Sequence, residues 1–187
     1  MNKACFLDRD GVINEEVNYL HEPDKTIIMP GTAEALKLLK SHGFIAVVVT
    51  NQAGVARGYY EETDIHAVHQ RIEELLAAEG AALDDFFYCP HHEKITGECK
   101  CRKPNPGMLL KAIAKHNIDP TQSFMVGDRL TDLEAGHSAG CSRNYLVNTG
   151  YGAQAKVQDN IPSYVTIADD LLSAVKDFLD QTHDNQD

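Results

Sequence analysis

Short apolar runs alternate with segments of helical periodicity along this chain, and this alternation restricts its fold more than any other feature. Six runs have the composition of strands, at residues 4–7, 44–49, 86–88, 124–126, 145–147 and 164–167. Predicted helices cover residues 32–41, 62–78, 107–115, 131–139 and 171–179. Because strands that alternate with helices pair in parallel through right-handed crossovers, the sequence predicts an α/β fold with a doubly wound, mainly parallel sheet.

The chain has the size and composition of one domain. Its 187 residues are 43% hydrophobic, which is enough to bury a sizeable core. No internal repeat or low-complexity linker divides it, so residues 1–187 are predicted to form a single domain. Only the polar tail, residues 180–187, is expected to fray.

Charge and hydropathy exclude several classes of partner. A formal net charge of −11 argues against general binding to nucleic acid or to anionic membranes, because neutralising phosphates requires surplus Lys and Arg. No run of about 18 apolar residues is present, and the first residues lead directly into a predicted strand. We therefore expect a cytoplasmic protein with no membrane association, and no obligate protein partner is evident.

Four clusters of reactive side chains follow one another along the chain. They are Asp8-Arg9-Asp10-Gly11-Val12, Val49-Thr50-Asn51, Arg102-Lys103-Pro104, and Gly127-Asp128-Arg129 with Asp132 close behind. Three of them follow apolar runs, which places them at the carboxyl ends of parallel strands, where open α/β sheets bind ligands. Together they offer a nucleophile, a hydroxyl group, a cation and a metal-binding carboxylate. This combination predicts phosphoryl transfer through an aspartyl intermediate.

Each cluster alone has an ordinary structural interpretation. The Asp8/Asp10 pair resembles a solvated loop or a helix cap, and Thr50 resembles a turn residue. Lys103 has the character of a surface cation, and Asp128 that of a helix N-cap. The occurrence of all four in this order favours the functional interpretation.

A second constellation is typical of a metal site. Cys89 and His91 precede Cys99 and Cys101 by one loop, and two Cys/His pairs so spaced supply the four donors of a closed tetrahedral zinc site. Three free thiols and a surface histidine are the alternative, and His92 is a competing donor. Four protein ligands leave no open position, so the predicted zinc is structural. Because Arg102 and Lys103 follow directly, zinc is expected to hold the loop 89–103 that presents these cations.

The first, second and fourth clusters and Lys103 resemble the motifs of the haloacid dehalogenase superfamily, over residues 4–132. The resemblance implies a Rossmann-like fold in which Asp8 attacks phosphorus and Asp10 acts as general acid and base. It also implies that Mg²⁺ is held by Asp8, the backbone oxygen of Asp10, and Asp128, oxygen donors of the type that this ion prefers. Thr50 and Lys103 would stabilise the transferred phosphoryl group, and Asp132 is expected to be a hydrogen-bond partner rather than a ligand.

The spacing of the motifs leaves no room for the cap domain that many members of this superfamily carry. Substrate selection therefore falls to three loops, residues 15–25, 53–60 and 90–103. An uncapped site needs strong polar anchors, and Arg57, Arg102 and Arg129 are the candidates. Three arginines on an acidic protein predict a second anionic group on the substrate.

Two uncapped, zinc-binding families resemble the chain at Asp-Arg-Asp-Gly, Cys-Pro-His and Cys-x-Cys-Arg-Lys-Pro. They are the histidinol-phosphate phosphatases and the D-glycero-D-manno-heptose 1,7-bisphosphate 7-phosphatases. Residues 51–58, Asn-Gln-Ala-Gly-Val-Ala-Arg-Gly, are more similar to the heptose family, although Ala53 replaces its usual Ser. Arginines also suit a second phosphate better than the amine of histidinol phosphate.

The heptose resemblance implies removal of the C7 phosphate, which gives heptose 1-phosphate for nucleotide-activated heptose and then lipopolysaccharide core or another surface glycan. A non-catalytic sugar-phosphate sensor is the alternative from another class, but binding alone does not require the nucleophile Asp8. The predicted substrate-binding residues are Glu16, Val17, Asn18, Tyr19, Asn51, Gln52, Ala53, Arg57, Arg102 and Arg129.

Overall fold

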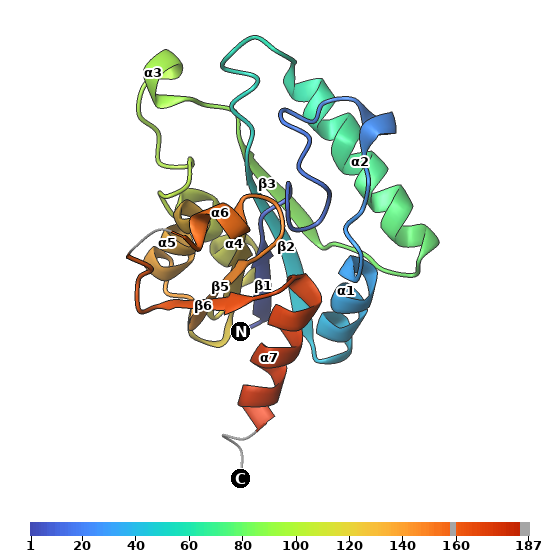
Figure 1. The fold of residues 1–187 in the computed structure, drawn as a ribbon, viewed down its shortest axis with the longest axis vertical. Coiled ribbons are helices and arrows are strands. Elements are labelled where there is room, and N and C mark those ends of the chain that lie inside the picture. Colours follow the sequence, from blue (N-terminus) through green and yellow to red (C-terminus); the bar gives the residue numbers. More distant parts are fainter. Residues whose placement is uncertain (158–159, 184–187) are drawn as a thin grey trace.

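The computed structural model describes residues 1–157 and 160–183, and it contains one six-stranded sheet (Figure 1). The strand order is β3-β2-β1-β4-β5-β6, and every neighbouring pair is parallel. The predicted doubly wound parallel sheet is therefore confirmed, with each strand close to its predicted position. The strands are β1 (Lys3–Leu7), β2 (Phe44–Asn51), β3 (Asp85–Cys89), β4 (Phe124–Gly127), β5 (Arg143–Val147) and β6 (Val165–Ala168).

Five long helices occupy the connections that the sequence assigned to them. They are α1 (Thr32–Ser41), α2 (Glu62–Ala78), α4 (Gly107–His116), α5 (Leu130–Ser138) and α7 (Leu171–His183). The last helix continues beyond its predicted end, through part of the tail that was expected to fray, and residues 184–187 lie outside the described residues. Four pieces too short to show periodicity were not predicted: η1 (Pro23–Lys25), α3 (Glu93–Thr96), η2 (Pro120–Gln122) and α6 (Gly152–Ala155).

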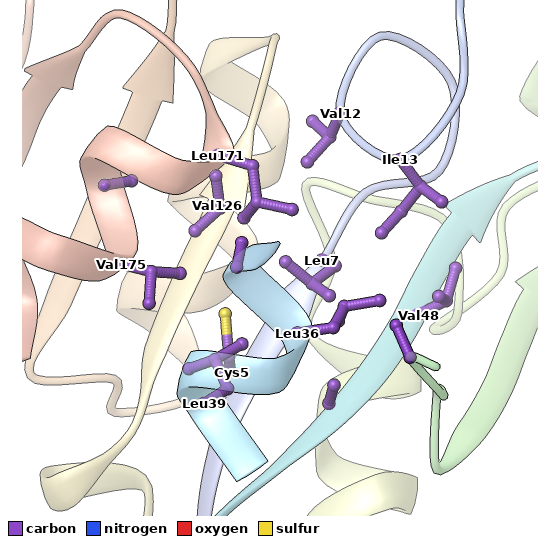
Figure 2. Packing of buried hydrophobic residues seen from close by; sticks show 14 of the residues in the cluster. Cys5, Leu7, Val12, Ile13, Leu36, Leu39, Val48, Val126, Leu171 and Val175 are labelled. Atoms are coloured by element: carbon purple, nitrogen blue, oxygen red, sulfur yellow. The ribbon is translucent and has the colours of Figure 1, made fainter. Parts of the chain in front are cut away.

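The sheet is covered by helices on both faces, because alternate residues of each strand point in opposite directions. In β1, Cys5 and Leu7 belong to the core layer beneath α1, α2 and α7, whereas Ala4 and Phe6 belong to the layer beneath α4 and α5. Figure 2 shows side chains of the first layer meeting between β1, α1 and α7. Each fully buried Leu or Val contributes about 1.5 to 3 kcal/mol, so both layers fix the strands that carry the reactive clusters.

The register of the central strands sets the position of these clusters. Leu7, the last residue of β1, lies beside Val48 of β2 and Val126 of β4. The Asp8 amide donates to the Val126 carbonyl oxygen at 3.0 Å, which carries the chain over the edge of the sheet. Asp8, Thr50 and Asp128 consequently gather at the carboxyl ends of β1, β2 and β4.

The connections leave this edge without a separate covering domain. The segment between β1 and β2 contains only η1 and α1, and the segment between β2 and β4 adds only one strand to its helices. In Figure 1 the loops that follow β1, β2 and β3 gather beyond the carboxyl ends of the strands, and α3 lies in the last of these loops. Across the described part of the chain, no helix is long and apolar enough to span a membrane.

Candidate active site

Lys103 is buried at the centre of the strand ends, where it joins three elements. Its Nζ lies 2.7 Å from Asp8 Oδ1 and 2.8 Å from Asp132 Oδ1, and it donates to the Val49 carbonyl oxygen at 2.8 Å. These contacts use all three ammonium protons. The carboxylates raise the pKa of Lys103, although burial opposes the charged form. The cation is therefore fixed beside the predicted nucleophile.

Three carboxylates share the space around this lysine. One oxygen from each of Asp8, Asp128 and Asp132 lies within 4.8 Å of the others, and all three residues are buried. Burial raises the pKa of Asp8 well above its usual range, an effect that Lys103 opposes and that Asp132 and Asp128 reinforce. Burial and Asp132 also raise the pKa of Asp128 to about 7. When all three carboxylates are ionised, the single ammonium group of Lys103 leaves two negative charges without compensation.

The donor set fits a hard divalent cation. Asp128 Oδ1 is buried and has no hydrogen-bond partner, whereas the two oxygens of Asp132 face Lys103 and the Arg129 amide. A free carboxylate oxygen beside Asp8 is the kind of ligand that Mg²⁺ binds. This arrangement is consistent with Asp128 as a ligand and Asp132 as a supporting hydrogen-bond partner.

Two glycines allow the nucleophile loop to approach Asp128. Gly11 and Gly150 have φ values of 86° and 55°, and a Cβ atom on either residue would collide with the Asp128 carboxylate. The other Asp128 oxygen, Oδ2, accepts a hydrogen bond of 2.8 Å from the Tyr151 amide. The segment after β5 is therefore a wall of the carboxylate site, although the sequence motifs gave no sign of it.

Asp10 is held by side chains that sequence reasoning largely missed. Arg9 is completely buried and donates to both Asp10 oxygens, at 2.9–3.1 Å. Asn14 donates to Oδ1 at 2.9 Å, and Gln52 donates to Oδ2 at 3.0 Å. An arginine between two acidic residues was the available signal for Arg9. These hydrogen bonds fix the direction in which the Asp10 carboxyl group faces.

Gln52 connects Asp10 to the hydroxyl group of Thr50. The same Nε2 donates to Thr50 Oγ1 at 2.9 Å, and the Tyr60 hydroxyl donates to Gln52 Oε1 at 2.8 Å. Burial raises the pKa of Tyr60 to about 12. The Tyr60 ring packs over Gly54, where a Cβ atom would collide with it. Gln52 was predicted to contact substrate, and its amide is here engaged with two predicted catalytic residues.

A cavity of about 320 Å³ opens above these groups and is lined by residues from all three predicted loops. The predicted residues in its wall are Asp8, Asp10, Glu16, Asn18, Tyr19, Thr50, Asn51, Gln52, Ala53, Arg57, Arg102, Lys103, Arg129 and Asp132. Tyr60, His92, Thr131 and Tyr151 also line it and were not predicted. Val17 does not: its side chain lines a neighbouring hollow together with Ile27 and is 40% exposed.

The three arginines lie around this cavity, as the sequence led us to expect. Arg57 Nη2 lies 3.0 Å from His92 Nε2, and Arg102 Nη1 donates to the His91 carbonyl oxygen at 3.2 Å. Arg129 stands over the ring of Tyr151, 3.9 Å from its centroid. Each arginine comes from a different loop, so the cavity has positive charge on several sides of its opening.

Asn51 anchors the backbone of Lys103 to β2. The Lys103 amide donates to Asn51 Oδ1 at 3.0 Å, and Asn51 Nδ2 donates to the Lys103 carbonyl oxygen at 3.1 Å. This pair of hydrogen bonds joins residues 52 positions apart. Lys103 therefore has a connection to the sheet that does not pass through the cysteine loop, whereas Arg102 bonds within that loop.

The four predicted zinc donors converge at the end of β3, where Cys89 is the last residue of the strand. Their Sγ atoms lie 3.1–3.6 Å apart, and His91 Nδ1 lies 3.3 Å from Cys101 Sγ and 3.7 Å from Cys89 Sγ. Ligands of a tetrahedral zinc ion are separated by about 3.5 to 3.8 Å, given Zn–S near 2.3 Å and Zn–N near 2.1 Å. All five cysteines of the chain are free. The cluster fits zinc, and the competing His92 caps α3 instead.

Comparisons with known proteins agree with this geometry. Residues 100–174 match the HAD-hydrolase-like family model. The D-glycero-beta-D-manno-heptose-1,7-bisphosphate 7-phosphatase of Pasteurella multocida is 48% identical over 154 residues, which are 80% of this chain and 84% of the relative. The Escherichia coli K12 protein of the same name is 39% identical over 92% of this chain and 93% of the relative.

A solved structure has the same fold throughout. It is the D,D-heptose 1,7-bisphosphate phosphatase from B. bronchiseptica complexed with magnesium and phosphate, which is 34% identical, with a TM-score of 0.88. The match covers 96% of this chain and 99% of that one. The chain therefore belongs to the D-glycero-D-manno-heptose-1,7-bisphosphate 7-phosphatase family of haloacid dehalogenase-like hydrolases.

Proposed function

We propose that this enzyme removes the C7 phosphate of D-glycero-D-manno-heptose 1,7-bisphosphate by a magnesium-dependent reaction and releases heptose 1-phosphate. The observation that carries the proposal is the buried cluster of Asp8, Lys103 and Asp128, of which Asp8 and Lys103 line a cavity surrounded by arginines. The relatives named for this activity, up to 48% identical, support it. The product would serve the synthesis of nucleotide-activated heptose for lipopolysaccharide core or another surface glycan.

In the first chemical step, a carboxylate oxygen of Asp8 attacks phosphorus and the bond to the C7 oxygen breaks. Asp10 gives its proton to the departing oxygen, and an acyl phosphate remains on Asp8. In the second step, Asp10 takes a proton from water as that water attacks the acyl phosphate. Inorganic phosphate leaves and Asp8 is regenerated. The hydrogen bonds from Arg9, Asn14 and Gln52 keep Asp10 oriented through both steps.

Lys103 and Thr50 stabilise the negative charge of the transferred group, because both reach the cavity from fixed positions at strand ends. Asp8, the Asp10 backbone oxygen and Asp128 would hold Mg²⁺, which supplies the positive charge that lets an anionic nucleophile approach an anionic phosphate. Its charge would also compensate the crowded carboxylates and keep Asp8 ionised despite burial.

Cys89, His91, Cys99 and Cys101 would hold a structural zinc ion. The convergence of four soft donors in one polar loop supports this assignment. The bound ion would fix the peptide that carries Arg102, since Arg102 donates to the carbonyl oxygen of His91.

The arginines Arg57, Arg102 and Arg129 would bind the C1 phosphate at the far end of the substrate. A phosphate dianion accepts charge-assisted hydrogen bonds from several guanidinium groups. Histidinol phosphate, the substrate of the alternative family, carries a cationic amine at that end, and three arginines repel it.

The test compares phosphate release, with Mg²⁺, from four substrates: both anomers of the heptose bisphosphate, histidinol phosphate and a hexose monophosphate. Both anomers are needed because one relative, from Photorhabdus laumondii, is named for the alpha anomer and is 39% identical. We expect kcat/KM for one heptose bisphosphate to exceed the others by at least about tenfold, the value of one lost charged hydrogen bond. Faster turnover of histidinol phosphate would contradict the proposed substrate, and activity without Mg²⁺ would contradict the proposed dependence on magnesium.

A further inference from the structure

Tyr151 lines the cavity, and its side chain has no role in the chemistry described above. It is half-buried at the start of α6, directly opposite the helix that begins after Arg129. The Arg129 guanidinium stands over its ring, with Cζ 3.9 Å from the ring centroid. This is the separation of a close cation–π pair, which attracts a guanidinium to the face of an aromatic ring.

The backbone beneath Tyr151 is tied to the catalytic centre on two sides. The Tyr151 amide donates to Asp128 Oδ2, and the neighbouring Thr149 hydroxyl donates to the Gly11 carbonyl oxygen at 2.6 Å. Gly150 packs against both Asp128 and Gly11 so closely that no side chain fits there. The ring therefore projects from a support whose position relative to the nucleophile loop is fixed.

Arg129 differs from this support, since it is exposed. Among the described residues, no carboxylate forms an ion pair with its guanidinium group. Glu16 is near enough for the charge of Arg129 to lower its pKa, although burial, followed by Asp10, raises it overall. An exposed arginine loses rotamer freedom when it binds a ligand, and this loss reduces affinity.

Packing against an aromatic ring restricts the rotamers of the Arg129 side chain and keeps its charge available, which an ion pair with a carboxylate does not. A carboxylate would neutralise the guanidinium charge and occupy its N–H donors. An aromatic face contacts the flat side of the group, so the N–H donors at its edge stay available for an anion. Tyr151 therefore restrains Arg129 and leaves its charge and hydrogen bonds for the substrate.

We propose that Tyr151 is a positioning residue that holds Arg129 over the cavity for the distal phosphate of the substrate. This inference rests on the proposed function, because the distal phosphate is the anion that Arg129 would meet. The ring, and not the hydroxyl group, carries the effect. The backbone amide that supports Asp128 is present whichever side chain occupies position 151.

The test uses Tyr151→Leu, which removes the ring, and Tyr151→Phe, which keeps it. For the heptose bisphosphate, the leucine variant should raise KM about two- to fivefold, the factor that corresponds to about 0.5 to 1 kcal/mol for an exposed cation–π pair. Its kcat and the Mg²⁺ concentration for half-maximal rate should change less than KM, and phenylalanine should restore KM. In an Arg129→Met background, Tyr151→Leu should have no further effect on KM.

Equal losses in the leucine and phenylalanine variants would overturn the proposal, and so would a leucine effect that persists in the Arg129→Met background. A readout independent of substrate separates this inference from the proposed function. In the wild-type and phenylalanine proteins, ring current should displace the Nε–H proton resonance of Arg129 upfield relative to the leucine variant. Displacement without turnover of the bisphosphate would contradict the proposed function alone, whereas turnover without displacement would contradict the role of Tyr151.

Discussion

The two candidate metal-binding clusters of this protein are assembled from different kinds of chain segment. Asp8, Asp128 and Lys103 come from separate parts of the chain and meet only because β1, β2 and β4 end at one edge of the sheet. The four cysteine and histidine donors lie within residues 89–101: Cys89 is the buried last residue of β3, and the other three lie in the loop that follows it. The first cluster therefore depends on the sheet for all of its members, whereas the second is attached to the sheet through Cys89 and depends otherwise on its loop and on the ion that it would bind.

Lys103 is the point where the two clusters meet, because it follows Cys101 by two residues and ion-pairs with Asp8. The Asn51 side chain and the two carboxylates attach it to the sheet. Arg102, one residue closer to the cysteines, bonds to the His91 carbonyl oxygen instead. The boundary between the sheet-supported site and the loop-supported site thus falls between Arg102 and Lys103. The following experiments test that boundary.

The largest effect is expected at the sheet-supported cluster. Asp8→Asn should keep the fold and much of the substrate affinity but lower kcat by at least about 10⁴-fold, because an amide cannot form the acyl phosphate. Steady-state kinetics and circular dichroism measure the two properties. Beryllofluoride should bind the wild-type protein with Mg²⁺ and fail to bind the variant. Wild-type turnover by Asp8→Asn would remove Asp8 from the mechanism.

A weaker and different effect is expected at the loop-supported cluster. Cys99→Ser combined with Cys101→Ser should abolish zinc binding, which elemental analysis measures, and should leave the sheet folded. Because Arg102 depends on this loop and Lys103 does not, KM for the bisphosphate should rise about tenfold or more, the value of a lost charged hydrogen bond, while kcat falls less. Adding Mg²⁺ should not restore KM. If kcat falls by a hundredfold with KM unchanged, Lys103 depends on zinc after all.

Two asparagines provide a matched comparison across the boundary. Asn51→Ala removes the anchor of Lys103, and Asn105→Ala removes a hydrogen bond of 2.8 Å to the Cys99 carbonyl oxygen in the loop. We expect Asn51→Ala to lower kcat about tenfold, because a displaced cation stabilises the transition state less well. Asn105→Ala should affect mainly zinc retention and KM. Identical changes in kcat and KM for the two variants would show that the sheet-supported and loop-supported sites are not separate.

The last effect is on stability and not on turnover, and it leaves both clusters intact. His69 is buried against Phe86, with ring centroids 4.3 Å apart. Burial, with a smaller effect of Arg9, lowers the pKa of His69 to about 3. Because the folded-state pKa lies below the unfolded value near 6.5, this group stabilises the fold above that pH, and the stability is lost as pH falls toward about 3.

The substitution His69→Phe tests this pH dependence of stability, and His66→Gln, at an exposed position of the same helix, is the control. Between pH 7 and pH 5, urea unfolding should show the wild type losing about 2 kcal/mol more than the His69→Phe variant. The control should follow the wild type. Parallel profiles for wild type and His69→Phe would show that His69 does not contribute to acid sensitivity.

The sequence was sufficient for the sheet because hydrophobic periodicity reports strands and helices directly. It also placed Asp8, Thr50 and Asp128 together, since residues that end neighbouring parallel strands must meet. The four cysteine and histidine donors were predictable for a different reason: their spacing is local, and a short loop can close only in a few ways.

Contacts between the loops could not be predicted from the sequence. The Asn51–Lys103 hydrogen bonds and the approach of Tyr151 to Asp128 depend on how separate crossover connections pack, which no local pattern records. Val17 was predicted to bind substrate together with Glu16, Asn18 and Tyr19, and the other three residues line the cavity. Asn18 and Tyr19 adopt left-handed φ values of 50° and 61°, and Val17 lies outside the wall of the cavity, an arrangement that no local sequence pattern predicts.

The wall of the cavity consists of loops that follow different strands of the same sheet. A loop that begins and ends at fixed points can change in length or composition without moving the strand ends that hold the reacting groups. Selectivity and chemistry are thus separable during evolution, and also in the laboratory. Replacing residues 55–59 with a differently charged segment, which keeps Gly54 and the Tyr60 hydrogen bond to Gln52, is a direct route to a phosphatase with the same reaction and another substrate.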